Sequence, residues 1–139
     1  MTKVTTKYEN GGSGRDGVVR VLIVDDHQVF RDALRELVAA VPRFVLVGQA
    51  CSGAEAVDLA EQSSPQLVLM DVMMPNMDGI AATRAILSRH PRVVVVLISV
   101  DDPASYPGAD QLGESVVCAR KQDLRPAELS QVWEEALHA

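Results

Sequence analysis

Two kinds of hydrophobic pattern alternate along the chain from residue 18 to the end. Short, nearly continuous apolar runs rich in Val, Ile and Leu indicate strands that are buried on both faces. Segments whose apolar residues recur every three or four positions indicate helices with one buried face. The predicted strands are residues 18–24, 44–50, 66–70, 92–98 and 116–119, and the predicted helices are residues 29–41, 52–63, 79–90 and 126–137.

Strands that alternate with helices predict an α/β fold, in which a parallel sheet has helices on both faces and right-handed crossovers. The connection at residues 101–114 is the exception. Pro103 is placed to start a helix there, but Pro107 and Gly108 would end it after about one turn. The fourth helix is therefore predicted to be short or disordered.

The composition is that of one ordinary globular domain. The chain has 139 residues, of which 47% are hydrophobic, and a single core usually serves roughly 100–150 residues. Residues 1–17 are rich in Gly, Ser, Thr and Asn and lack an apolar stretch, so we expect a flexible tail followed by a domain at residues 18–139. The net charge of −6 repels a phosphate backbone, so we expect no direct binding of nucleic acid by this domain.

No segment approaches the roughly 20 apolar residues that span a bilayer, so no membrane contact is expected. The two cysteines, Cys51 and Cys118, lie far apart in the sequence and form no Cys-x-x-Cys motif. This pattern predicts neither a disulfide scaffold nor a zinc site, and a reduced, cytoplasmic location is expected.

Polar side chains follow the predicted strands at their carboxyl ends, where ligands bind in open parallel sheets. Asp25 and Asp26 follow the first strand, Asp71 the third, Ser99 the fourth and Lys121 the fifth. Grouped carboxylates repel each other unless a cation lies between them, and oxygen ligands suit Mg²⁺. A lysine and a hydroxyl at the same edge would complement a phosphoryl group.

Each of these residues alone has an ordinary structural explanation. An aspartate pair often caps a helix, an Asp-to-Gly loop is often only a turn, and a lone lysine is usually a solvated charge. His27 is predicted to open the first helix rather than to take part in chemistry. Because these residues arrive at successive strand ends, we interpret them together as a site that places a phosphoryl group on a carboxylate.

Two segments carry a specific family resemblance. Residues 71–79, with the sequence DVMMPNMDG, and residues 21–27, VLIVDDH, resemble the receiver domains of bacterial two-component response regulators, and most of all those of the nitrate-regulator and nitrogen-fixation-regulator class. The spacings between Asp26, Asp71, Ser99 and Lys121 agree with that family. The resemblance implies a flavodoxin-like (βα)5 three-layer sandwich with strand order 2-1-3-4-5.

The same resemblance implies a role for each carboxylate. Asp71 would be the phosphoacceptor, taking a phosphoryl group from a sensor histidine kinase. Asp26 would bind Mg²⁺ directly and Asp25 partly through water, with Asp71 and the backbone carbonyl of Met73 as further ligands.

Lys121 would pair with the carboxylate or the phosphoryl group, and Ser99 would move to donate a hydrogen bond to a phosphoryl oxygen. Phosphorylation would then switch homodimerisation or an output. The resemblance implies that this chain is the N-terminal part of a transcriptional regulator, which contacts DNA through a C-terminal output domain. It also implies a domain that catalyses its own phosphorylation and dephosphorylation rather than an enzyme.

Cys118 stands where the resembled family usually carries a Tyr or Phe, which moves inward when the serine binds the phosphoryl group. The usual coupling between phosphorylation and output is therefore not expected to work through position 118. One alternative is therefore a receiver that works alone as an interaction scaffold. A second alternative is a Mg²⁺-dependent phosphatase of the haloacid-dehalogenase type. Such enzymes carry an acid/base aspartate two residues after the nucleophile, where this chain has Met73.

Overall fold

The computed structural model describes residues 17–137, which form five strands and four α-helices. The strands are β2 (Val19–Val24), β3 (Phe44–Ala50), β4 (Leu67–Asp71), β5 (Val94–Ser99) and β6 (Val116–Arg120). The helices are α1 (Gln28–Ala39), α2 (Gly53–Ser63), α3 (Gly79–Arg89) and α4 (Pro126–Leu137). Every predicted strand and helix is confirmed, with ends that differ by a few residues. The tail predicted at residues 1–17 lies outside the described residues except for its last position.

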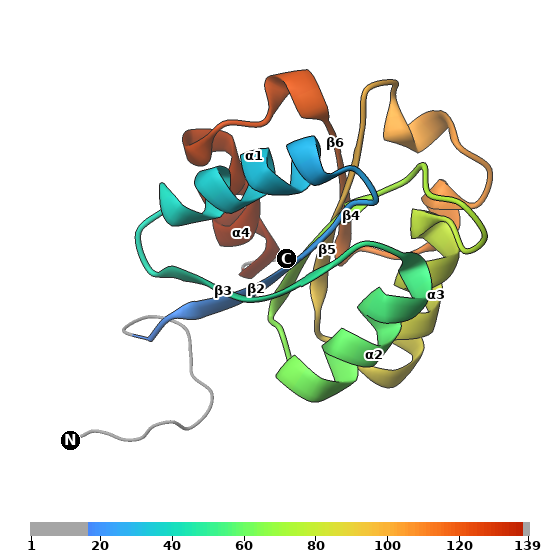
Figure 1. Cartoon of the computed structure of the whole chain (residues 1–139), viewed down its shortest axis with the longest axis horizontal. Coiled ribbons are helices and arrows are strands. Elements are labelled where there is room, and N and C mark those ends of the chain that lie inside the picture. Colours follow the sequence, from blue (N-terminus) through green and yellow to red (C-terminus); the bar gives the residue numbers. More distant parts are fainter. Residues whose placement is uncertain (1–16, 138–139) are drawn as a thin grey trace.

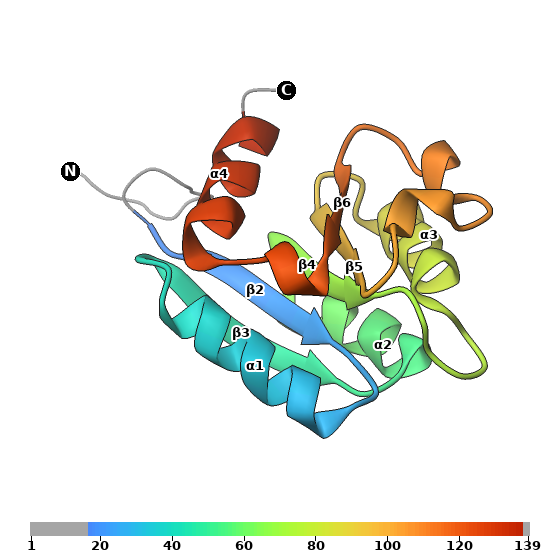
Figure 2. The ribbon, with the colours of Figure 1, turned by 90° about the horizontal axis from the view of Figure 1, so that it is seen from above.

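The five strands form one parallel sheet in the order β3-β2-β4-β5-β6. In chain order this is 2-1-3-4-5, so the flavodoxin-like fold is confirmed. Helices α1 and α4 cover one face of the sheet, and α2 and α3 cover the other (Figure 1). Because all strands run in the same direction (Figure 2), their carboxyl ends lie at one edge of the molecule.

Two hydrophobic cores lie on the two faces of the sheet. Side chains alternate between them along a strand, so that Leu22 and Val24 pack with α2 and α3, whereas Val21 and Ile23 pack with α1 and α4. Trp133 of α4 is 4% exposed and makes an edge-to-face contact with Phe44, so it belongs to the core on the α1 and α4 face. The central strands β4 and β5 are buried throughout, and this gives the residues at their ends a rigid support.

The crossover between β5 and β6 departs from the helical pattern, as the sequence predicts. Two single-turn 3₁₀ helices, η2 (Pro103–Ser105) and η3 (Ala109–Gln111), replace an α-helix. Gly108 separates them with a φ of 89°, a backbone conformation that glycine adopts without strain. The fourth helix is therefore short rather than disordered. A third such turn, η4 (Lys121–Asp123), follows β6.

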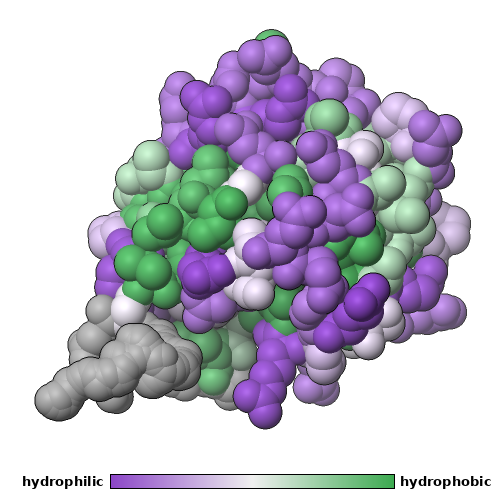
Figure 3. Space-filling model, turned by 60° about the horizontal axis from the view of Figure 1, so that its bottom comes forward, coloured by the Kyte–Doolittle hydropathy of each residue, from purple (hydrophilic) through white to green (hydrophobic). Residues whose placement is uncertain are grey.

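Strand β3 is an edge of the sheet and is less buried than the central strands. Val45 is 41% exposed there. Figure 3 shows the lower face of the molecule, where the largest group of hydrophobic side chains lies on the left, a smaller one lies on the right, and hydrophilic side chains lie between and above them. No helix in residues 17–137 is long and apolar enough to cross a membrane.

Gly79 lets the first turn of α3 approach the end of β4. Its N–H donates a 2.9 Å hydrogen bond to the carbonyl of Val72. A Cβ atom at this position would lie 2.1 Å from the backbone oxygen of Asp71 and 2.9 Å from the Cα atom of Val72. Both neighbours are backbone atoms, so a side chain at position 79 would displace the strand end that carries Asp71.

We therefore expect Gly79→Ala to lower the free energy of unfolding by about 1–3 kcal/mol, although alanine favours a helix over glycine by about 1 kcal/mol. Urea unfolding measures the change. Gly48→Ala is the matched control, because its Cβ would meet only the ends of two side chains, Leu22 Cδ1 at 3.2 Å and Leu59 Cδ1 at 3.8 Å, and should cost less. Equal or increased stability of Gly79→Ala would show that the close approach is unimportant.

Candidate functional site

The polar residues predicted from the strand ends lie at the expected positions. Asp25 directly follows β2, Asp71 is the last residue of β4, Ser99 is the last residue of β5, and Lys121 directly follows β6. Asp25, Asp71 and Ser99 are at most 2% exposed. Burying ionised or polar groups without partners costs free energy. Their burial together at one edge of the sheet therefore indicates a functional site.

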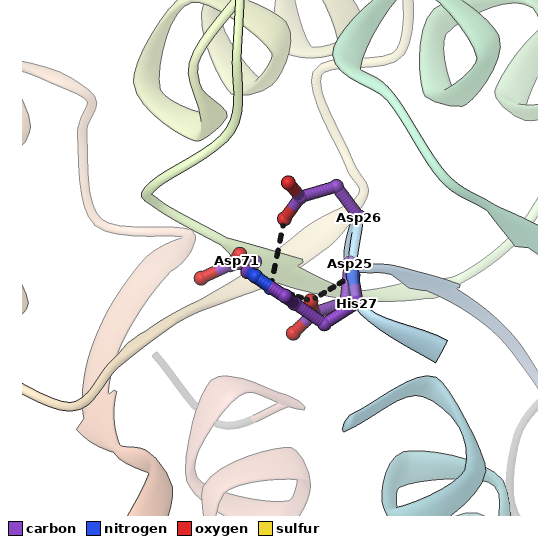
Figure 4. Close-up of side chains that lie close together, drawn as sticks. All are labelled: Asp25, Asp26, His27 and Asp71. Atoms are coloured by element: carbon purple, nitrogen blue, oxygen red, sulfur yellow. Dashed lines mark hydrogen bonds and ion pairs between the residues drawn. The ribbon is translucent and has the colours of Figure 1, made fainter. Parts of the chain in front are cut away.

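The acidic side chains meet in a small cluster, shown in Figure 4. One ligand atom from each of Asp25, Asp26, His27 and Asp71 lies within 4.8 Å of the others. The His27 Nδ1 atom is 3.1 Å from Asp26 Oδ1 and 3.5 Å from Asp25 Oδ1. The backbone N–H of His27 also donates a 2.9 Å hydrogen bond to Asp25 Oδ1.

Lys121 supplies the positive charge beside the two buried carboxylates. Its Nζ atom lies 3.1 Å from Asp25 Oδ2 and 3.7 Å from Asp71 Oδ1. The ring of Phe30 in α1 packs against the ammonium group, with 3.6 Å between Nζ and the ring centroid. This cation–π contact fixes the lysine between α1 and the carboxylates.

Two carboxylate oxygens of the cluster have no hydrogen-bond donor among the described residues. Asp25 Oδ2 and Asp26 Oδ1 are buried and accept no hydrogen bond within residues 17–137, although each lies near one cationic or basic side chain. Buried carboxylate oxygens without hydrogen bonds are destabilising unless a cation neutralises them. This set of hard oxygen atoms matches the ligands that Mg²⁺ prefers.

Burial and charge act together on Asp71. Burial is the main reason why the pKa of its carboxyl group rises from 3.8 to about 6, and the negative charge of Asp25 adds to the rise. The ammonium group of Lys121 and a hydrogen bond from the backbone of Met73 oppose this rise, and Asp26 adds a smaller contribution to it. In the protein alone, Lys121 and Met73 thus stabilise ionised Asp71 by less than burial and the neighbouring carboxylates destabilise it.

Ser99 is held by the crossover that follows it. The Ser99 Oγ atom accepts a 3.2 Å hydrogen bond from the backbone N–H of Asp101 and lies 3.2 Å from the hydroxyl oxygen of Tyr106. Cys118, at the position where the resembled family carries an aromatic residue, is exposed. The aromatic hydroxyl beside Ser99 therefore comes from the crossover and not from β6.

The structure brings Asp25, Asp26, Asp71 and Lys121 together, and the backbone N–H of Met73 donates a hydrogen bond to Asp71. Sequence reasoning missed the contributions of three residues: His27, Phe30 and Tyr106. His27 is the N-cap of α1, as predicted, but its ring also contacts the carboxylates. The Asp-Asp-His order could have indicated this, whereas no sequence pattern marks Tyr106.

Comparison with known proteins identifies the family model "Response regulator receiver domain", which matches residues 21–109. Among curated proteins, the transcriptional regulatory protein DegU of Brevibacillus brevis is 39% identical over 88 residues, which cover 63% of this chain and 37% of DegU. A protein-glutamate methylesterase/protein-glutamine glutaminase of Myxococcus xanthus is 46% identical over 79 residues, covering 57% of this chain and 22% of that protein. The chain thus spans well under half the length of these curated relatives.

Solved structures give the same result. The signal receiver domain of the putative response regulator NarL from Mycobacterium tuberculosis superposes with a TM-score of 0.76 at 31% sequence identity. The match covers 88% of this chain and 99% of that chain, so the similarity extends over nearly the whole domain.

Asp71 should make stability depend on pH in metal-free buffer. Its carboxyl group holds a proton more tightly in the folded chain than in the unfolded chain, so its contribution to stability falls as pH rises from about 4 through about 6. We expect Asp71→Asn to be more stable than the wild type, with an advantage about 1 kcal/mol larger at pH 7.5 than at pH 5. Urea unfolding in the presence of a chelator measures both values.

Asp58→Asn is the matched control, because Asp58 is exposed on α2 and its replacement should change stability little at either pH. If the difference in free energy of unfolding between Asp71→Asn and the wild type were the same at both pH values, the raised pKa of Asp71 would be contradicted.

Proposed function

Since the chain belongs to the response regulator receiver domain family, we propose that Asp71 accepts a phosphoryl group from a phosphohistidine of a sensor histidine kinase. One observation carries the assignment. Asp71 is a buried carboxylate at a strand end, its Oδ1 atom lies 3.7 Å from the Lys121 ammonium group, and two more carboxylates adjoin it. Asp25 has its nearest cation at 3.1 Å and Asp26 lies against His27, so Asp71 is the carboxylate best placed for transfer.

In the proposed reaction, a carboxylate oxygen of Asp71 attacks the phosphorus atom of the donor. A new O–P bond forms as the N–P bond to the donor imidazole breaks, and the imidazole nitrogen keeps the electron pair and takes up a proton. The attacking oxygen must be ionised, which the pKa of about 6 allows at neutral pH. Such transfers need mainly positioning and neutralisation of charge, which few side chains can supply.

The residues present fit a Mg²⁺ ion. The buried oxygens without hydrogen bonds on Asp25 and Asp26, the Asp71 carboxylate and the backbone carbonyl of Met73 would hold it. When bound, Mg²⁺ would neutralise the negative charge of the carboxylates and of the incoming phosphoryl group. We assign His27 to the charge contact with Asp26, whose Oδ1 atom lies 3.1 Å from His27 Nδ1, and not to the metal, because Mg²⁺ prefers oxygen to imidazole nitrogen.

Lys121 and Ser99 would hold the phosphoryl group once it is attached. The Lys121 ammonium group is already within 3.7 Å of Asp71 and would pair with a phosphoryl oxygen. Ser99, at the end of the neighbouring strand, would donate its hydroxyl hydrogen to another. Phosphoryl oxygens accept strong charge-assisted hydrogen bonds, so the modified site would favour new positions for these two side chains.

The surface around the site supports a protein as phosphodonor. Val29, Met73 and Val100 are 77%, 62% and 57% exposed, and they follow the site residues closely in the sequence. Exposed apolar side chains beside a polar site are typical of protein interaction surfaces. A cytoplasmic kinase is the donor that fits this proposal.

The curated relatives include transcriptional regulators, so we propose that phosphorylation controls a transcriptional output. The net charge of −6 makes DNA contact through this domain unfavourable, and a separate DNA-binding domain would supply it. Homodimerisation of the phosphorylated domain is the proposed link to that output. A receiver that acts only as a scaffold is the alternative.

Mixing the purified protein with Mg²⁺ and a small phosphodonor, such as acetyl phosphate or phosphoramidate, tests the proposal. We expect the intact mass to rise by one phosphoryl group in the wild type and in Asp58→Asn, an exposed aspartate away from the site. The increase should disappear in Asp71→Asn and fall at least tenfold in rate when Mg²⁺ is chelated, because charge neutralisation at the carboxylates is lost.

An unmodified wild type that folds and binds Mg²⁺ would support the scaffold alternative. Continuous release of phosphate without lasting modification would instead support a phosphatase. That result is not expected, because Met73 stands where such an enzyme needs an acid/base aspartate.

A further inference from the structure

The Ser99 hydroxyl group is shared between two parts of the β5–β6 crossover. Its Oγ atom accepts a hydrogen bond from the backbone N–H of Asp101 and contacts the hydroxyl group of Tyr106, both at 3.2 Å. One buried oxygen atom therefore fixes both the beginning of the crossover and a residue at the end of its first 3₁₀ turn.

Tyr106 is in turn the residue that joins the two 3₁₀ turns. Its N–H donates to the carbonyl of Pro103 at 3.2 Å, and its own carbonyl accepts from the N–H of Ala109 at 3.1 Å. Its half-buried side chain packs against the core beneath α2 and α3. Pro103 and Ala109 are buried on either side of it, so a movement of Tyr106 would be transmitted to residues 103–112.

We propose that Tyr106 is a positioning residue for Ser99, and that the Ser99–Tyr106 contact transmits phosphorylation at Asp71 to residues 103–112. The inference rests on the proposed function, because it requires Ser99 to turn toward a phosphoryl group. It also names the segment that changes when Asp71 is phosphorylated, which is the crossover with the two 3₁₀ turns.

The hydrogen-bonding capacity of the two hydroxyl groups explains the coupling. Ser99 has one hydroxyl hydrogen, and phosphoryl oxygens can only accept. Once Ser99 donates to the phosphoryl group, Tyr106 must either become the donor to Ser99 or lose the contact. The present O···O distance of 3.2 Å is long for a bond between hydroxyl groups, so a charge-assisted bond to phosphate would outcompete it.

The same rotation would also disturb the bond from Asp101. Because both bonds end on Ser99 Oγ, its displacement loosens the crossover at two points at once. The amides of Ala109, Gln111 and Leu112 report on this, since each donates a hydrogen bond within or between the 3₁₀ turns. Faster exchange of these amides is the expected sign of the coupling.

Hydrogen exchange followed by mass spectrometry tests the proposal on the whole chain with Mg²⁺, before and after treatment with phosphoramidate. In the wild type we expect the amides of residues 103–112 to exchange about threefold faster or more after phosphorylation. In Tyr106→Phe they should exchange at the faster rate from the start and respond no further. Ser105→Ala is the matched control, because it removes a hydroxyl group of the same crossover that, within the described residues, bonds only to the Asp102 carbonyl; it should respond like the wild type.

The intact mass of every sample separates this proposal from the proposed function. Fully phosphorylated wild type whose crossover exchange is unchanged would overturn the coupling while leaving phosphorylation intact, as would a Tyr106→Phe variant that responds like the wild type. If no sample takes up phosphate, the Ser99–Tyr106 contact can still be tested by comparing Ser99→Ala and Tyr106→Phe with the variant that carries both substitutions. Their effects on crossover exchange should coincide rather than add, and additive effects would overturn it.

Discussion

The structure depends on one electrostatic constraint, which is that three carboxylates converge where parallel strands end. Asp25 and Asp71 are almost fully buried, and Asp26 adjoins them. Within residues 17–137, the ammonium group beside the two buried carboxylates is that of Lys121, fixed by the ring of Phe30. One positive charge does not balance three negative ones, and the acidic cluster is therefore typical of a site for a divalent cation. The proposed phosphoryl transfer depends on this imbalance.

The fold makes this arrangement rigid. Strands β4 and β5 are buried along their whole length, so Asp71 and Ser99 project from elements that cannot easily shift, and Gly79 keeps the start of α3 against the backbone of Asp71. The crossover after Ser99 is different, because two single 3₁₀ turns hold fewer internal hydrogen bonds than an α-helix would. In our proposals, the phosphoryl group is thus attached to the stiff part of the domain, and the response takes place in the crossover, which is easier to move.

Most of the fold and the acidic part of the site could be predicted from the sequence. Apolar periodicity located each strand and helix, and the position of aspartates after strands located the acidic site, because parallel strands deliver their carboxyl ends to one edge. The strand order came from the family resemblance. Tyr106 could not be anticipated, since it lies in a segment without periodicity, and its contact with Ser99 depends on how Pro103 and Gly108 turn the chain. The role of Phe30 was hidden because an apolar residue on a helix face is first interpreted as core. The boundary predicted at residue 18 stays a prediction.

The most direct test of the account is to locate the phosphoryl group itself. An acyl phosphate can be reduced with borohydride, which converts the modified aspartate to homoserine, and peptide mass spectrometry then identifies the position. We expect homoserine at position 71 alone after treatment with Mg²⁺ and phosphodonor. Homoserine at position 25 or 26, or phosphate retained on a serine or histidine, would contradict the assignment of Asp71 as the acceptor.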